Sequence, residues 1–112
     1  MVVVDKAKLR IRDIIINDLS YGLYGSDGSG ATTTDTEIKA PIDATEGQPD
    51  FTTDGQTIRT EYIVDSQTAT GETFREFGVF FSDDSMFFRV VFPDYDHTTE
   101  DELHITVLSR VN

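Results

Sequence analysis

The chain has 112 residues and a mass of 12.5 kDa, which suits one domain with roughly 6,200 Å² of folded surface and leaves too little chain for a cleft between two domains. Its 21 acidic and 9 basic residues give a formal net charge of −12, which argues against binding to a phosphate backbone. The sequence has no cysteine, no apolar run near the roughly 18 residues of a membrane span, and no basic-then-apolar start, so we expect no disulfide, membrane segment or secretory signal.

Residues 5 to 19 predict a helix, because apolar residues recur there at spacings of three and four. Asp5 is the expected N-cap, although Lys8 three residues later provides no capping box. Leu9 and Ile16 lie seven residues apart on the opposite side, and either pack within the domain or meet a neighbouring chain. The main apolar stripe consists of Val4, Ala7, Ile11, Ile14, Ile15 and Leu19.

A short strand is expected at residues 21 to 24, followed by a loop at residues 25 to 36 that is rich in glycine and hydroxyl side chains. The loop lacks the Walker lysine and the GxGxxG spacing of phosphate-binding loops. Asp27 and Asp35 disfavour an anion further. Residues 37 to 50 contain two prolines and weak periodicity, so we expect them to be mostly irregular.

From residue 51 the apolar pattern has a period of two, which is typical of strands. Residues 51 to 53 form an expected strand, with Asp54 and Gly55 as the hairpin turn into the next one. That next strand has two distinct faces. One face is formed by Ile58, Thr60, Tyr62 and Val64, and the other by Arg59, Glu61, Ile63 and Asp65.

Residues 74 to 92 predict a β-hairpin, since two apolar runs flank a four-residue loop at residues 82 to 85. The register that pairs Phe81 with Met86 makes one face almost wholly apolar, and this face is the expected core surface. The core face consists of Phe77, Val79, Phe81, Met86, Phe88, Val90 and Phe92, and the opposite face of Glu76, Gly78, Phe80, Phe87, Arg89 and Val91.

The same register predicts an ion pair on the opposite face of this hairpin. Gly78 lies across from Arg89 and leaves space for its side chain, which can lean towards Glu76 on the diagonal. A Glu76–Arg89 ion pair is therefore expected, and finding the two charges on opposite faces would place the register in error by one residue.

Pro93 is expected to end the second arm, and residues 94 to 101 form an acidic connection to a last strand that runs from Leu103 to about Val111. The elements together predict an α+β domain that is mainly antiparallel β, either a β-sandwich or a small open barrel, with one N-terminal helix. The whole chain, residues 1 to 112, is expected to be a single domain.

No motif of the sequence supports catalysis or metal binding. His97 and His104 are seven residues apart on a β-pattern, which does not fit the helical spacing of a zinc hydrolase, and both are expected to be exposed. The acidic connection does not follow the EF-hand pattern, and Asp83–Asp84 is a turn. We therefore expect no catalytic, cofactor-binding or metal-binding residue and no enzymatic activity.

The order of elements resembles a family of small tail or baseplate structural proteins of tailed bacteriophages and their archaeal counterparts. The segment FREFGVF at residues 74 to 80 is similar to a family pattern of the type IREVGLF. It is followed by the apolar strand MFFRVVFP at residues 86 to 93 and by a Thr- and acid-rich approach to the last strand at residues 98 to 107. The resemblance implies a non-enzymatic virion subunit, present in several copies and assembled in the host cytoplasm.

The resemblance also implies the partners: further copies of the chain and other tail, baseplate or fibre proteins, with no nucleic acid and no membrane. The expected assembly contacts are Leu9, Ile16, Phe80 and Phe87. A head-decoration, turret or neck protein of the same virion is one alternative. Another alternative is a glycan-binding β-sandwich for host recognition, which would use the exposed aromatic residues Tyr21, Tyr24 and Tyr95.

The acidic composition suggests adaptation to molar salt. Fourteen of the acids are Asp, only three residues are Lys, and Thr occurs fifteen times. Eight Phe and four Tyr distinguish the chain from acidic disordered sequences, which are poor in aromatic residues. Self-repulsion in such a domain is best screened at high ionic strength, where the Debye length falls to about 3 Å at 1 M salt. We therefore expect a tailed virus of a halophilic host, against the simpler alternative of an ordinary acidic surface.

The salt hypothesis predicts that the free energy of unfolding rises with KCl concentration between about 50 mM and about 3 M, because added ions screen the repulsion among the acidic side chains. Denaturation in urea, which adds no charge, measures this at each salt concentration. Equal stability at both ends of the range would leave only an ordinary acidic surface.

Overall fold

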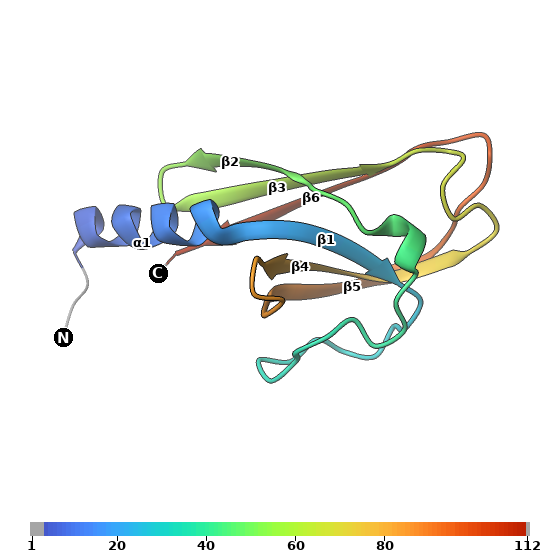
Figure 1. The fold of residues 1–112 in the computed structure, drawn as a ribbon, viewed down its shortest axis with the longest axis horizontal. Helices are drawn as coiled ribbons and strands as arrows, with labels where there is room; N and C mark the ends of the chain where they lie inside the picture. The colour runs from blue at the N-terminus through green and yellow to red at the C-terminus, as the bar shows by residue number, and fades with distance from the viewer. Residues whose placement is uncertain (1–3, 112) are drawn as a thin grey trace.

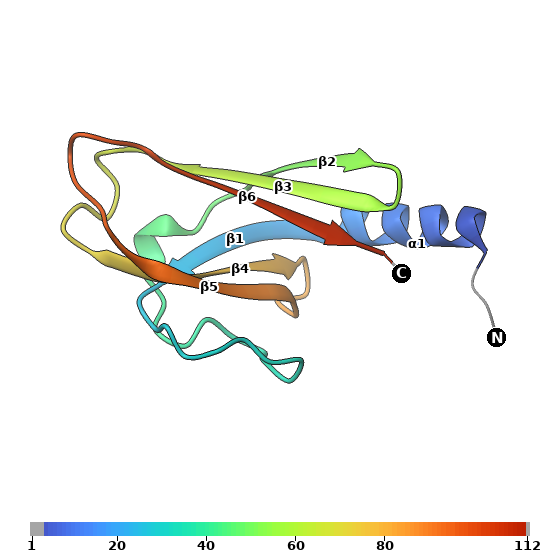
Figure 2. The same cartoon turned by 180° about the vertical axis from the view of Figure 1, so that it is seen from behind.

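The computed structural model describes residues 4 to 111, which form one α-helix, a short 3₁₀ helix and six strands (Figure 1). The elements are α1 (Asp5–Asp18), β1 (Leu19–Gly25), η1 (Asp43–Thr45), β2 (Asp50–Asp54), β3 (Thr57–Val64), β4 (Thr73–Phe81), β5 (Met86–Asp96) and β6 (Leu103–Arg110). The strands make two three-stranded antiparallel sheets, in the orders β1-β4-β5 and β2-β3-β6. The sheets face each other without closing into a barrel, so the expected α+β fold class is confirmed as an open sandwich (Figure 2).

Aromatic side chains fill the space between the two sheets. Tyr24 lies at the centre, with ring centroids 4.7 Å from Phe77, 5.1 Å from Phe74 and 5.8 Å from Tyr62. Tyr24, Phe74 and Phe77 are fully buried. Tyr24 was expected to be exposed in the glycan-binding alternative. That expectation is wrong, because the Tyr24 ring packs against aromatic side chains of β4 and β3.

The strand pattern of period two is confirmed in β3. Ile58, Thr60 and Val64 are buried, whereas Arg59 and Ile63 on the alternate positions are exposed. β2 pairs with β3 up to the Asp54–Thr57 pair, so the two-residue turn is Gly55–Gln56, one residue later than expected. Gly55 has a φ of 57°, a conformation that glycine adopts without steric cost.

The β4–β5 hairpin follows the predicted register over four consecutive pairs, from Glu76 opposite Val91 to Val79 opposite Phe88. An irregularity between Val79 and Phe80 then shifts the pairing by one residue, so that Phe80 lies opposite Met86 instead of Phe81. Beyond such a bulge the side chains change face.

The bulge makes the predicted positions of Met86 and Phe87 wrong. The Met86 methyl lies beside Gly78 on the outer face, whereas Phe87 packs with the core and lies 5.6 Å from the ring of Phe81. Phe87 therefore adds to the core of its own chain, and Met86 takes the outward position that the uninterrupted register assigns to Phe87.

Pro93 does not end β5, contrary to expectation, because the strand continues to Asp96. β5 is the edge strand of its sheet, where a residue without an N–H is tolerated on the unpaired side. The extension pairs Phe74 with Tyr95 and Thr73 with Asp96, which lengthens one border of the sandwich.

Helix α1 confirms the expected helix, but much of the main apolar stripe is exposed to solvent. It begins after Val4, an N-cap whose apolar side chain accepts no hydrogen bond, so the assignment of Asp5 as N-cap is wrong. Ile15 and Ile16 pack against the core, whereas Val4 is 65% exposed, Ile11 41% and Ile14 71%.

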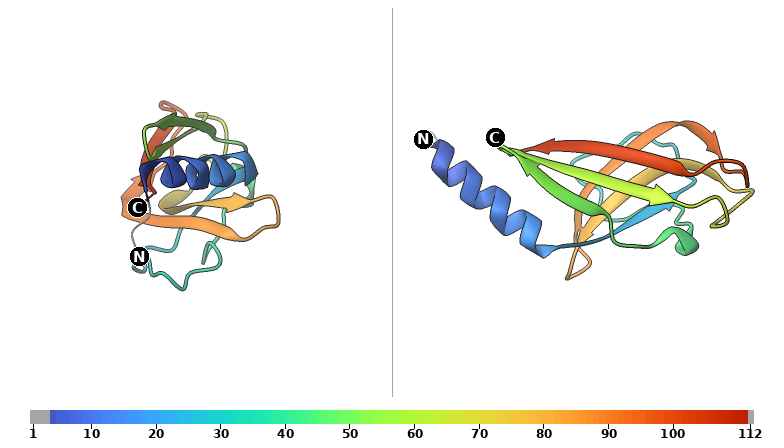
Figure 3. Two further views of the ribbon diagram at one scale, coloured as in Figure 1. Left: turned by 90° about the vertical axis from the view of Figure 1, so that its left-hand side faces the viewer. Right: turned by 90° about the horizontal axis from the view of Figure 1, so that it is seen from above.

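The helix stands out from the sandwich. Seen from above, α1 extends past the ends of the strands (Figure 3, right). The radius of gyration is 14.8 Å, against roughly 13 Å for a compact domain of this length. Because α1 runs into β1 without an intervening loop, the direction of β1 sets which helix face meets the domain.

Candidate functional site

A buried ion pair joins β4 and β5 on the outer face of their sheet. The Nε of Arg89 donates a hydrogen bond to Oε1 of Glu76 at 3.0 Å, and both side chains are fully enclosed. Gly78 lies opposite Arg89 in the ladder, as the register predicts, so the structure brings the two expected partners together.

The Glu76 carboxylate also holds both ends of the loop between β1 and η1. Its Oε2 accepts hydrogen bonds from the backbone N–H of Asp27 at 2.7 Å and of Ala40 at 3.1 Å. Its Oε1 accepts from the backbone N–H of Lys39 at 2.9 Å in addition to Arg89. Four donors occupy the positions that two carboxylate oxygens offer, so Glu76 has no lone pair left for acid–base chemistry.

Arg89 fixes the middle of the same loop. Its guanidinium donates to the Asp35 carboxylate at 3.3 Å and to the backbone oxygen of Asp27 at 3.2 Å. The backbone N–H of Thr32, together with Arg89, holds the pKa of the Asp35 carboxyl below its usual value. The loop is thus tied down by charge-assisted hydrogen bonds rather than by regular secondary structure.

The loop closes the outer face of the β1-β4-β5 sheet, on the side away from the other sheet (Figures 1 and 2). Ile38 of the loop is buried, and a Cβ atom on Gly78 would lie only 2.7 Å from its Cδ1 atom. On the same face Phe80 is 5% exposed and stacks on Tyr21 with ring centroids 4.9 Å apart. Most of this apolar face is therefore covered by the chain itself.

The two histidines lie in different surroundings. His97 was expected to be exposed, but it is buried, with its ring 5.2 Å from that of Phe74 and its Nε2 atom 2.7 Å from the backbone oxygen of Asp65. His104 is exposed beside Glu102. Within residues 4 to 111 no group of three or more His, Asp or Glu side chains is arranged to hold a metal ion.

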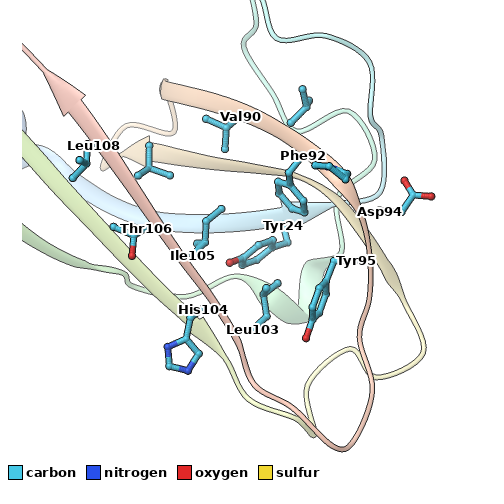
Figure 4. Close-up of a pocket in the computed structure, with 13 residues that line it drawn as sticks. Tyr24, Val90, Phe92, Asp94, Tyr95, Leu103, His104, Ile105, Thr106 and Leu108 are labelled. Atoms are coloured by element: carbon cyan, nitrogen blue, oxygen red, sulfur yellow. The ribbon is translucent and has the colours of Figure 1, made fainter.

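An apolar groove of about 510 Å³ runs between the edge strands β5 and β6 (Figure 4). Its lining residues are Tyr24, Val90, Val91, Phe92, Pro93, Asp94, Tyr95, Leu103, His104, Ile105, Thr106, Val107 and Leu108. The ring of Tyr24 lies between the two strands, and its hydroxyl is buried with no hydrogen-bond partner among residues 4 to 111. This burial raises the pKa of Tyr24 strongly.

The structure places the four expected assembly residues at different depths. Phe80 is almost fully buried by its own chain, and Ile16 and Phe87 pack against the core. Leu9 is half-buried beside the β2–β3 turn. Their contacts with other chains stay a prediction, and the more exposed apolar residues are Ile11 and Ile14 of α1 and its N-cap Val4.

Sequence reasoning thus missed the β5–β6 groove and the outward orientation of the α1 stripe. The stripe was visible as a helical periodicity, but its orientation was not. None of the helices formed by residues 4 to 111 has both the length and the apolar character needed to span a membrane.

A comparison with known protein families, curated proteins and solved structures finds no match to this chain.

The buried pair predicts that Arg89→Met destabilises the protein by about 3–5 kcal/mol, because it leaves the enclosed Glu76 carboxylate without its countercharge. Urea denaturation of wild type and variant measures the difference.

Arg59→Met is the matched control, since Arg59 forms an exposed ion pair with Glu61 at 2.8 Å and its loss is expected to change stability by about 1 kcal/mol or less. Equal effects of the two substitutions would show that the enclosed pair does not hold the loop.

Proposed function

We propose that the chain is a non-enzymatic structural subunit of a virus tail, in the baseplate or tail-fibre attachment region, which assembles with copies of itself and with other tail proteins. The observation that carries this proposal is the outward stripe of α1, which exposes large apolar side chains on an element that stands away from its own domain. Those side chains are Val4, Ile11 and Ile14.

The energetics of α1 support an assembly role. A helix of 14 residues is marginal in water without tertiary packing, and the residues of α1 are only exposed or half-buried in the single chain. Contact with a neighbouring chain would bury the stripe and stabilise the helix.

The accessible surface area of the single chain also supports an assembly role. The accessible surface is 6784 Å², about 600 Å² more than the roughly 6,200 Å² typical of a compact monomer of this mass. A specific interface takes about 800 Å² from each partner, which is a similar amount.

The place in the tail rests on the resemblance of the FREFGVF and MFFRVVFP segments to tail and baseplate proteins, and a head-decoration, turret or neck position would use the same assembly chemistry. The glycan-binding alternative has less support, because Tyr24 is buried and Tyr21 is stacked on Phe80.

The proposal predicts that the purified chain forms a defined oligomer in molar KCl, and that Ile14→Asp reduces it to monomers because a carboxylate would enter the apolar interface. Light scattering coupled to size-exclusion chromatography measures the mass.

Ile63→Asp is the control, since Ile63 is another exposed apolar residue, 49% exposed, on the outer face of β3. A wild-type chain that stays monomeric at every concentration and salt tested would refute the structural-subunit proposal.

A further inference from the structure

The β5–β6 groove is the open side of the sandwich. On the opposite side, the edge of β1 is covered by the segment before β2, through backbone bridges of Gly22 to Gly47 and of Gly25 to Pro41. β5 and β6 are the outer strands of their sheets and border the groove. Leu108 at its rim is 67% exposed.

The groove has an apolar floor and an acidic border. The floor consists of Val90, Phe92 and Ile105, which pack on the core. Asp94 also lines the groove and pairs with Arg75 at 2.7 Å. Asp96 at the end of β5 adds a further acid at the same end, and the connection from β5 to β6 adds Glu100, Asp101 and Glu102. A fitting partner therefore carries apolar side chains flanked by cations.

Helix α1 carries apolar side chains flanked by cations. Four of the nine basic residues of the chain lie within its first eight positions, whereas the rest of the chain is strongly acidic. Three of the four make no ion pair with a described residue, and only Arg12 does so, with Asp13. The basic residues of the helix are Lys6, Lys8, Arg10 and Arg12.

The length of α1 matches the length of the groove. The 14 residues of α1 span about 21 Å. The six β6 residues that line the groove, 103 to 108, span about 20 Å.

The helix cannot fill the groove of its own chain. The Arg12 side chain donates to the backbone oxygen of Gly55, and the Gln56 amide donates to Asp5 at 3.3 Å. Both contacts hold α1 beside the β2–β3 turn, with the stripe of Val4, Ile11 and Ile14 facing away from the domain.

We propose that α1 of one copy lies in the β5–β6 groove of the next copy, with its apolar stripe on the groove floor and its lysine and arginine side chains at the acidic border. This inference rests on the proposed function, since it requires that copies assemble. Because the docking element and its site are different surfaces, the interface is heterologous, and repetition closes into a ring when the rotation allows it.

A mixing experiment tests the direction of assembly. Ile14→Asp places a carboxylate on the apolar stripe of α1 and leaves the groove unchanged. Leu108→Asp places a carboxylate at the rim of the groove and leaves α1 unchanged. Each variant alone is expected to be monomeric in molar KCl. An equimolar mixture is expected to form a heterodimer and nothing larger, because it contains one intact helix–groove pair. Ile63→Asp, at a residue outside α1 and outside the lining of the groove, is expected to keep the wild-type mass.

The outcomes separate the two proposals. A wild-type chain that is always monomeric would refute both the assembly role and the docking. An oligomer that survives Leu108→Asp but is lost in Ile14→Asp would keep the structural role and overturn the groove as the site, in favour of helix–helix contact or another partner.

A covalent trap covers the case in which Leu108→Asp unfolds the edge strand. The chain has no cysteine, so a short bismaleimide joins only introduced thiols. Chains with Ile11→Cys and chains with Leu108→Cys are expected to cross-link to each other far more than either does to itself. Cross-linking confined to pairs of Ile11→Cys chains would overturn the proposal.

Discussion

The enclosed Glu76–Arg89 pair holds a loop over the outer face of the β1-β4-β5 sheet, and so determines which apolar surface is covered within the chain. One carboxylate accepts from Arg89 and from backbone N–H groups near both ends of the loop, which closes the outer face of the β1-β4-β5 sheet. Burying two charges is tolerated only when their polar atoms are hydrogen-bonded, and here both Glu76 oxygens and all three Arg89 guanidinium nitrogens have at least one partner. Because the loop covers that face, the apolar surfaces that residues 4 to 111 leave to a partner include the α1 stripe and the β5–β6 groove.

Features that depend on local pattern were predictable from the sequence. The alternation at residues 57 to 64 defines the buried face of β3, because side chains in a strand point to opposite sides in turn. The Glu76–Arg89 pair followed from a short hairpin loop and from a glycine opposite the arginine, which are both local constraints on register.

Features that depend on distant parts of the chain were not predictable. The bulge after Val79 exchanges the faces of Met86 and Phe87, and nothing in the alternation marks it. The orientation of α1 follows from the course of β1 through the sandwich, so the periodicity revealed the stripe but not its exposure. His97 is buried because the β5–β6 connection folds back onto Phe74, a contact between segments far apart in sequence.

Contacts within a chain and contacts between chains respond differently to assembly, and amide hydrogen exchange as a function of protein concentration in molar salt tests this difference most directly. Protection of the α1 and β6 amides is predicted to increase as the protein assembles, while protection of the Asp27, Lys39 and Ala40 amides stays constant because Glu76 holds them in every copy. Protection of α1 and β6 that does not change with concentration in an assembled protein, or loop amides that become protected only on assembly, would contradict this prediction.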